Sequence, residues 1–284
     1  MKIVQALYTK PFINDNIKIE VNYYLCYLSS YYANRLGYEV YMYTDDFGYE
    51  LLKDIPYYKE INIKLNELKD KNKYIVSLMK ACGKFIAMKD FITKYNEPFV
   101  FIDTDLFIKK DFIKNIPNQY DCVLQSKENR GSYIREWTIL DKIGYEKEYR
   151  KTDNIYNVGF MLFNNISMFN EFITPYFNSL IRYESVDNIK NYEDSYWFDF
   201  VFEQEYMGVL SEKYKIFPLL GDEKYTDINV KAISIGYQHL QGSKKYKNKK
   251  VIETLKNLVN AVKNGKSLVQ KSLNDITLFN LNSY

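Results

Sequence analysis

Two aspartates and one histidine are the side chains of this sequence best suited to hold a metal ion. Asp103 and Asp105 stand one residue apart, directly after the apolar run Phe99 to Ile102, and His239 is the only histidine. Carboxylate oxygens are good ligands for Mg²⁺ and Mn²⁺, and a neutral imidazole can complete such a site. A cation held there would keep open positions for diphosphate oxygens. The alternative is a polar cap at a strand end, with His239 as a hydrogen-bonded structural residue.

The residues after the histidine favour the metal hypothesis. Gly242 and Lys245 follow His239 in the sequence HLQGSKK. A glycine lets the backbone approach a phosphate closely, and a lysine neutralises phosphate charge. The spacing therefore favours a phosphate-binding segment over an isolated structural histidine.

A third segment lies between these two and carries Asn157 and Gly159 in the run NVGFMLFNN. The side chain of Asn157 offers two donors and an acceptor, which suits sugar hydroxyl groups, and Gly159 leaves room for a ring beside a strand. A bulged core strand explains the same residues equally well, so both interpretations stay open.

The elements expected to position these residues alternate between strands and helices, which predicts an α/β fold. The run Phe99 to Ile102 is continuous and apolar, as expected of a central strand covered on both faces, and ligands bind beyond the carboxyl ends of such strands. A turn is predicted at Thr44 to Gly48. Strands are predicted over residues 2–8, 38–43, 99–102, 120–125, 158–163 and 232–237, and helices over 17–36, 74–95 and 194–207.

Charge divides the chain into one large domain, residues 1–245, and a basic helical extension, residues 246–284. From Lys244 onward the sequence has nine lysines and two acidic residues. Apolar residues recur at helical spacing from Val251 to Val262, which indicates an amphipathic helix. Its apolar face could rest on anionic lipid as a peripheral membrane contact, or it could close over the core with the lysines outside.

Composition excludes several classes of protein. Of the 284 residues, 46% are hydrophobic and 26% charged, which is ordinary for a globular chain and excludes disorder. No run of about 18 apolar residues is present, and the first residues do not form a signal peptide. Three scattered cysteines, Cys26, Cys82 and Cys122, are typical of reduced core thiols, so a cytoplasmic location is expected.

Three ordered motifs together resemble glycosyltransferase family 8, which includes bacterial lipopolysaccharide galactosyl- and glucosyltransferases and glycogenin. They are FVFIDTD at 99–105, NVGFMLFNN at 157–165 and HLQGSKK at 239–245, and the resemblance spans residues 1–245. It implies a GT-A fold, a Rossmann-like mixed sheet flanked by helices that binds a nucleotide sugar. It also implies retaining transfer from a UDP-hexose, with Mn²⁺ held by Asp103, Asp105 and His239.

The resemblance assigns roles to further residues. Gly242 and Lys245 match diphosphate-contacting positions, and Lys84 stands where similar enzymes carry a basic residue near the donor, although a solvated helix face explains it as well. Glu193 and Asp194 fall in the acceptor-side segment and are the candidates to stabilise positive charge at the sugar C1 atom. A helix N-cap is the alternative for both. The acidic uridine-binding residue of the family is missing after the first strand.

Three functions follow as hypotheses. The first is a metal-dependent retaining glycosyltransferase that transfers a hexose to a glycan, lipid-linked glycan or protein acceptor, with no nucleic acid among its partners. The second is a catalytically idle nucleotide-sugar or carbohydrate-binding module. The third is a metal-dependent phosphodiesterase or nucleotidyltransferase, which also pairs carboxylates around Mg²⁺ but generally needs a richer set of acids and histidines.

Overall fold

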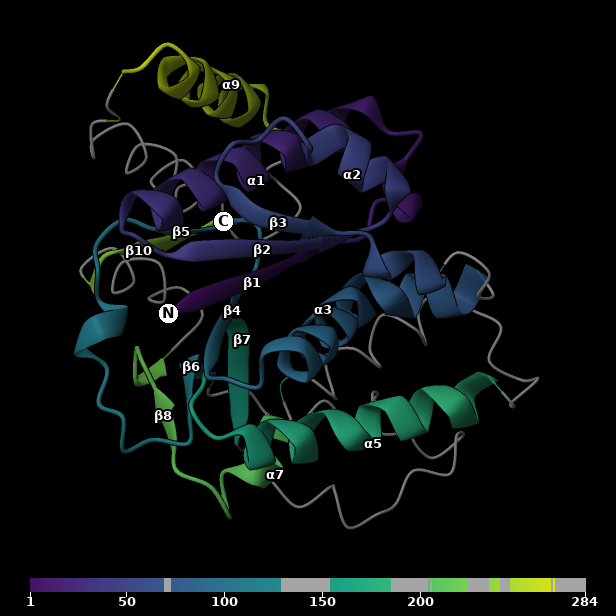
Figure 1. The fold of residues 1–284 in the computed structure, drawn as a ribbon, viewed down its shortest axis with the longest axis vertical. Helices are drawn as coiled ribbons and strands as arrows, with labels where there is room; N and C mark the ends of the chain where they lie inside the picture. Colours follow the sequence, from purple (N-terminus) through teal and green to yellow (C-terminus); the bar gives the residue numbers. More distant parts are fainter. Residues whose placement is uncertain are drawn as a thin grey trace.

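A mixed eight-stranded sheet forms the centre of the molecule (Figure 1). The computed structural model describes residues 1–68, 73–128, 154–184, 204, 206–223, 235–240, 246–266 and 268. Within these ranges the strand order is β3-β2-β1-β4-β7-β6-β8, and β9 pairs with β6. The strands are β1 (Lys2–Leu7), β2 (Glu39–Thr44), β3 (Tyr58–Asn62), β4 (Phe99–Ile102), β6 (Cys122–Glu128), β7 (Ile155–Phe163), β8 (Ile216–Pro218) and β9 (Asp222–Glu223).

Strand direction divides the sheet into two parts. Strands β3, β2, β1 and β4 are parallel neighbours, whereas β7 runs antiparallel to both β4 and β6. Every residue of β4 and β7 is buried, as the continuous apolar sequences of these strands require. The carboxyl end of β4 therefore opens in the middle of the sheet, at the edge where the parallel strands end.

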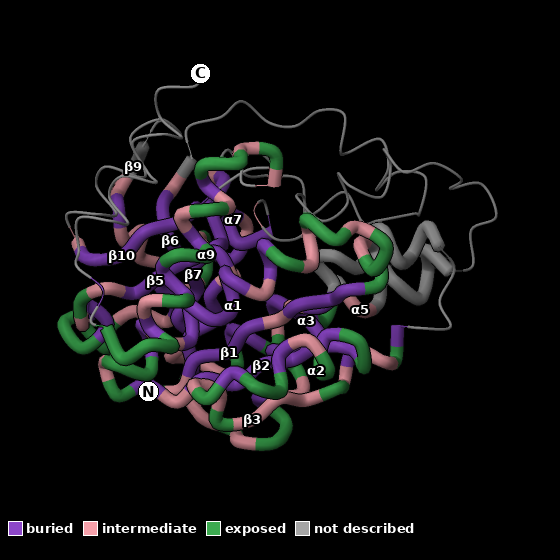
Figure 2. The backbone as a smooth tube through the Cα atoms, turned by 90° about the horizontal axis from the view of Figure 1, so that it is seen from above, coloured by how far each residue is buried: buried purple, intermediate pink, exposed green. Residues whose placement is uncertain are grey.

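Helices cover both faces of the sheet (Figure 1). They are α1 (Asn16–Arg35), α2 (Asp46–Leu52), α3 (Lys73–Tyr95), α5 (Ile166–Glu184), α7 (Tyr206–Leu210) and α9 (Lys249–Lys263), with short 3₁₀ helices η1 (Lys10–Phe12), η2 (Lys64–Leu68) and η3 (Ile113–Asn115). Alternate residues of β2 show the two layers, because Tyr41 and Tyr43 join the core cluster of α3 whereas Met42 joins that of α1. The predicted mixed α/β sheet flanked by helices is confirmed, and Figure 2 shows its inner strands β1, β2, β6 and β7 as buried, with β3 more exposed at the edge.

Local sequence explains where α1 begins and ends. The carboxylate of Asp15 accepts a hydrogen bond from the backbone N–H of Lys18, which caps the first turn. Gly37 follows the helix with a φ of +83°, and the N–H of Tyr38 returns to the carbonyl of Ala33. This is the Schellman arrangement that a left-handed glycine permits. The predicted stop at Gly37 is therefore confirmed.

A second, two-stranded sheet lies beside the main one and is formed by β5 (Leu106–Ile108) and β10 (Tyr237–His239). The strands are antiparallel, with His239 opposite Leu106 and Tyr237 opposite Ile108. Of the predicted strand over residues 232–237, Tyr237 lies in β10, Ile235 and Gly236 precede that strand, and residues 232–234 lie outside the described residues. This small sheet connects a late segment of the chain to the turn that follows β4.

Helix α9 packs its apolar face against α1. Five of its side chains are buried in the same cluster, namely Val251, Leu255, Leu258, Val259 and Val262. Its lysines Lys249, Lys250, Lys256 and Lys263 are exposed. Because the apolar face is used in packing, the structure gives no support to lipid contact through that face.

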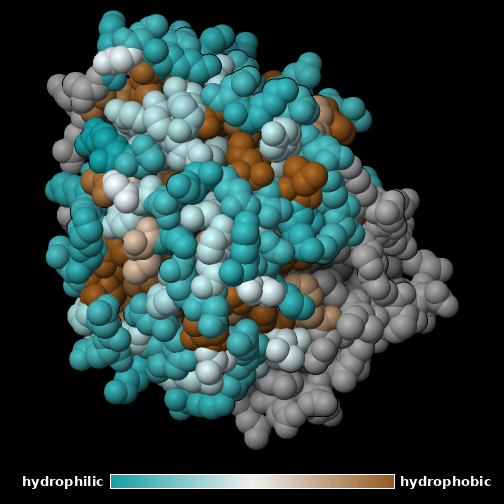
Figure 3. Space-filling model, viewed as in Figure 1, coloured by the Kyte–Doolittle hydropathy of each residue, from teal (hydrophilic) through white to brown (hydrophobic). Residues whose placement is uncertain are grey.

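The exposed surface is mainly hydrophilic. On the face shown in Figure 3, hydrophobic residues form separate patches between larger hydrophilic areas. Among the described residues, no helix combines the length and apolarity needed to span a membrane. Two of the cysteines are free and buried, and burial raises the pKa of Cys26 to about 12, so that thiol stays neutral.

One local prediction is wrong. The segment Thr44 to Gly48 was expected to form a turn, but α2 begins at Asp46. Asp45 caps this helix by accepting from the N–H of Gly48, and its carboxylate also accepts from the N–H groups of Thr9 and Lys10. Turn-forming residues are also good helix N-caps, so the tertiary contacts with Thr9 and Lys10 decide between the two outcomes.

Candidate metal centre

The two aspartates lie on a turn between β4 and β5. The backbone N–H of Asp103 donates to the carbonyl of Gly159 at 3.0 Å, and the N–H of Leu106 donates to the carbonyl of Asp103 at 3.0 Å. The second bond closes a four-residue turn with Thr104 and Asp105 at its centre. The chain therefore reverses direction at the end of the central strand and presents both carboxylates at its carboxyl end.

Strand β10 brings the histidine to this turn. The N–H of Leu240 donates to the carbonyl of Asp105 at 2.9 Å, which continues the ladder between β10 and β5 by one residue. His239 stands opposite Leu106 in that ladder, so its side chain lies next to the carboxylates. The ladder, rather than any local sequence signal, joins the two motifs.

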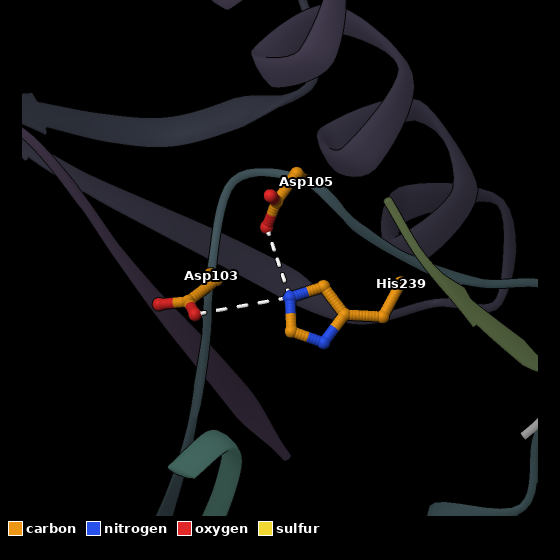
Figure 4. A group of neighbouring side chains, drawn as sticks. All are labelled: Asp103, Asp105 and His239. Atoms are coloured by element: carbon orange, nitrogen blue, oxygen red, sulfur yellow. Dashed lines mark ion pairs between the residues drawn. The ribbon is translucent and has the colours of Figure 1, made fainter. Parts of the chain in front are cut away.

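One nitrogen of the imidazole faces both carboxylates (Figure 4). His239 Nε2 lies 3.2 Å from Asp105 Oδ1 and 3.9 Å from Asp103 Oδ2. One ligand atom from each of the three residues lies within 4.8 Å of the other two. The side chain of His239 is 6% exposed and that of Asp105 12%, whereas that of Asp103 is 34% exposed. Of the three side chains, that of Asp103 is therefore the most accessible to a ligand.

The chemistry of this donor set fits a divalent cation. His239 Nδ1 lies 3.1 Å from Gln125 Oε1, and an amide oxygen can only accept a hydrogen bond. If Nδ1 carries the proton of a neutral ring, Nε2 points a lone pair at two carboxylate oxygens. Three acceptors that face one another repel unless a cation stands between them. Oxygen and imidazole ligands suit Mn²⁺ or Mg²⁺.

A bulge in β7 makes room for this arrangement. Ser126 pairs with Asn157 and Leu124 with Met161, so the register between β6 and β7 shifts at Gln125. Asn157 Oδ1 accepts from the N–H of Gly159 at 3.1 Å, so this amide finds its partner within the bulge. The Gly159 carbonyl pairs with Asp103, as described above. The bulge thus directs one backbone group of β7 to the aspartate turn.

Gly159 is the point of closest approach between β7 and the histidine. A Cβ atom at this position would lie 2.4 Å from His239 Cε1 and 2.9 Å from Gln125 Oε1. The ring beside this glycine is therefore the imidazole of His239. The sequence indicated that Gly159 leaves space for a ring, and the structure fills that space with a protein side chain.

Lys84 reaches the same site from α3. Its Nζ lies 3.7 Å from Asp103 Oδ1 and 5.7 Å from the centroid of the Phe101 ring. The side chain is only 12% exposed, so it does not belong to a solvated helix face. The ammonium offsets part of the negative charge of the aspartates and stands beside the most open of the three ligands.

Two consecutive buried hydrogen bonds support the turn that carries Asp103 and Asp105. Gln5 Nε2 donates to Ser29 Oγ at 2.7 Å, and Ser29 Oγ donates to the carbonyl of Leu106 at 2.7 Å. All three residues are fully buried. These hydrogen bonds connect β1 and α1 to the residue that follows Asp105, and so limit movement of that turn.

Four of the residues singled out from the sequence cannot be placed. Glu193, Asp194, Gly242 and Lys245 lie outside the described residues. Their proposed roles at the sugar and the diphosphate stay predictions. The structure instead brings together Asp103, Asp105, His239, Asn157, Gly159 and Lys84.

Sequence reasoning missed Gln125. Its position at the end of the apolar run Cys122 to Leu124 was predicted to be part of a strand, but no role was given to its side chain. A fully buried glutamine that continues an apolar strand is itself a signal, because buried amides need partners. The partner, His239, is 114 positions away in the sequence and could not be identified from it.

Together, the fold and the site define a mixed α/β protein with a candidate cation site at the carboxyl end of a central strand. The chain belongs to DUF6734, a family of unknown function, whose family model matches residues 1–264. No curated protein matches the sequence.

Among solved structures, the chain is similar to the galactosyltransferase LgtC in complex with donor and acceptor sugar analogs. The identity is 9%, the alignment covers 97% of this chain and 100% of LgtC, and the TM-score is 0.45. The glycosyltransferase GlyE of Streptococcus pneumoniae is 13% identical, with a TM-score of 0.43. The alignment covers 91% of this chain and 59% of GlyE. The chain is also similar to a putative nucleotide-diphospho-sugar transferase of Desulfovibrio desulfuricans, with 11% identity and a TM-score of 0.42. This alignment covers 94% of this chain and 98% of that one.

Proposed function

We propose that this protein is a metal-dependent glycosyltransferase of the GT-A type that transfers a hexose from a nucleotide sugar. The observation that carries the proposal is the convergence of Asp103, Asp105 and His239 at the carboxyl end of β4. Open α/β sheets bind ligands at this position, and two carboxylates with one imidazole form a donor set that suits a divalent cation. The motif order that resembles glycosyltransferase family 8 adds independent support from the sequence.

The proposed cation is Mn²⁺ or Mg²⁺, held by Asp103, Asp105 and His239. When bound, it would neutralise the oxygens of a diphosphate leaving group. Lys84 adds a positive charge 3.7 Å from Asp103, on the side where a diphosphate would lie. By resemblance, Gly242 and Lys245 contact the same diphosphate. These groups would stabilise the charge that develops on the leaving group.

For the sugar we propose a hexose carried by UDP and transferred with retention of its α configuration. Glu193 or Asp194 would stabilise positive charge at C1. The diphosphate itself could then accept the proton of the acceptor hydroxyl, so no separate general base is required. A β-linked product, measured by proton NMR of the new anomeric centre, would contradict retention and make these carboxylates candidates for an inverting base.

The acceptor class that we propose is a glycan, a lipid-linked glycan or a protein, reached in the cytoplasm. The exposed lysines of α9 give this part of the surface positive charge, which favours anionic acceptors over neutral ones.

A thermal-shift panel tests the donor. UDP-, GDP-, CDP- and dTDP-hexoses are compared at equal concentration with Mn²⁺ and with excess EDTA. We expect the largest stabilisation from a UDP-hexose with Mn²⁺ and almost none with EDTA, because the donor diphosphate needs the cation. Hydrolysis of the donor, followed as free UDP, is the matching activity assay. Equal stabilisation with and without the cation, or a preference for GDP or CDP, would overturn the metal or the donor assignment respectively.

A further inference from the structure

Gln125 is the residue that faces His239 from the side opposite the carboxylates. Its Oε1 lies 3.1 Å from His239 Nδ1, while Nε2 of the same ring lies 3.2 Å from Asp105 Oδ1. The two ring nitrogens therefore have different neighbours, an amide on one side and an acid pair on the other. With a cation on the acid side, the amide oxygen is the partner left for the proton of a neutral ring.

The position of the amide oxygen has a direct consequence for the ring. Oxygen Oε1 has no hydrogen to donate, so the contact is a hydrogen bond only when Nδ1 is protonated. A neutral imidazole protonated at Nδ1 presents a lone pair at Nε2, toward Asp105 and Asp103. This is the form of histidine that binds a metal ion through Nε2.

The surroundings of Gln125 indicate that this contact, rather than general packing, explains the residue. Gln125 is fully buried, and its Nε2 atom has no hydrogen-bond partner among the described residues. A buried amide nitrogen without a partner costs stability, which an apolar side chain of similar size would avoid. Gly159 leaves free the volume in which the Gln125 oxygen and the imidazole meet.

From these contacts we infer that Gln125 is a positioning residue that fixes the tautomer of His239, with its Nε2 lone pair directed at the carboxylates. The inference rests on the proposed cation site, since it explains how the third ligand is kept ready for the ion. Gly159 is part of the same arrangement, because a side chain at this position would separate the imidazole ring from the Gln125 amide oxygen.

The tautomer can be measured in protein saturated with Mg²⁺, which is diamagnetic, without any activity assay. His239 is the only histidine, so histidine-selective ¹⁵N labelling gives one pair of ring nitrogen signals. Long-range ¹H–¹⁵N correlation spectra at a pH where the ring is neutral then identify the protonated nitrogen. We expect Nδ1 to carry the proton in the wild-type protein. A ring protonated at Nε2 would overturn the inference, and this measurement needs no variant.

Two substitutions separate positioning from packing. Gln125→Met keeps the length of the side chain but removes the acceptor, so we expect loss of the Nδ1–H preference and Mn²⁺ affinity about 10- to 100-fold weaker. Gln125→Glu keeps an acceptor facing Nδ1 and should retain the tautomer and the wild-type affinity. Ser126→Ala is the control, since it changes the neighbouring buried residue of β6, whose hydroxyl group has no hydrogen-bond partner in the described part of the chain. Mn²⁺ affinity is measured by titration calorimetry.

The outcomes distinguish this inference from the proposed function. Equal Mn²⁺ affinity in the wild-type and Gln125→Met proteins would overturn the role of Gln125 while leaving the metal site intact. Absence of Mn²⁺ and Mg²⁺ binding in the wild-type protein would contradict the proposed metal dependence, which is a different result from equal affinity in the two proteins.

Discussion

Aspartates lie at both ends of the central strands, but their carboxylates have different neighbours at the two ends. At the carboxyl end, Asp103 and Asp105 face His239 Nε2. At the amino end, Asp121 precedes β6, beside a hollow of about 360 Å³ whose lining includes Pro98, Asn164 and Asn165. Asp121 Oδ1 accepts from Asn165 Nδ2 at 2.7 Å, and Oδ2 accepts from the N–H of Lys215 at 2.9 Å.

The comparison shows how the fold separates structural acids from candidate ligands. The carboxylate of Asp121 is paired with neutral donors from two segments, so it ties β6 to its neighbours and has no need of a cation. At the carboxyl end the oxygens face a ring nitrogen that is itself an acceptor in one tautomer. Acidic residues at a sheet edge are therefore better metal candidates where they share a site with an imidazole than where amide and backbone N–H groups occupy both carboxylate oxygens.

The largest expected effect comes from breaking the carboxyl-end group. Asp105→Ala and His239→Ala each remove one ligand atom, and we expect loss of detectable Mn²⁺ binding and turnover reduced about 100- to 1,000-fold or more. Calorimetry and release of free nucleotide measure the two quantities, and circular dichroism checks that the fold is kept. Wild-type turnover in both variants would remove this group from consideration as a metal centre.

The next largest effect is expected from Gly159→Ala. The new Cβ would lie 2.4 Å from His239 Cε1, so the imidazole must move away from the aspartates. We expect Mn²⁺ affinity to fall about 10- to 100-fold. The free energy of unfolding should also fall by about 1–3 kcal/mol, because the site is overpacked. An unchanged affinity together with an unchanged histidine NMR signal would mean that the ring has space that the structure does not show.

The amino end should respond in the opposite way. Asp121→Ala removes the acceptor of the Lys215 N–H and of the Asn165 amide, so we expect the free energy of unfolding to fall by about 0.5–1.5 kcal/mol. Mn²⁺ affinity should stay at the wild-type value. Urea denaturation and calorimetry measure the two quantities. A fall in Mn²⁺ affinity comparable to that of Asp105→Ala would end the distinction between the two regions.

The smallest effect concerns Lys109, which follows β5. Burial disfavours its charged form and lowers its pKa to about 8, from an ordinary value near 10.4. Between these values the folded chain binds fewer protons than the unfolded chain at this residue, so this lysine makes stability rise with pH there. Lys109→Met should remove that rise, measured as the difference between the denaturation midpoints of the two proteins across this range. Parallel pH profiles would contradict the assignment.

Much of the fold follows from sequence periodicity. Strand β4 matches its predicted range, and α1 and α3 begin and end within one residue of theirs, because their apolar patterns are long or bounded by Gly37 and Pro98. Strand β5 was missed, since three residues are too few for a pattern, and β3 and α5 were also not predicted. These elements form where tertiary contacts supply the partners.

The proximity of the three side chains of the candidate site was predicted from the sequence, but the contacts that support them were not. Residue types and the order of motifs pointed to Asp103, Asp105 and His239, and the structure brings these three together. The hydrogen bonds that hold them, from Gln125 and from the Ser29 hydroxyl group, join segments far apart in the sequence. Such contacts follow from strand register, which one sequence cannot determine.

The pairing of β5 with β10 also affects when the candidate metal centre can form during synthesis of the chain. The histidine joins residues more than a hundred positions earlier, so a nascent chain without β10 cannot assemble the centre. Cation binding would then stabilise only the completed fold, by about 2.7 kcal/mol when the free ion exceeds its Kd 100-fold. In a cell, availability of the ion would thereby set how long a finished chain survives proteolysis, while unfinished chains would gain no such protection.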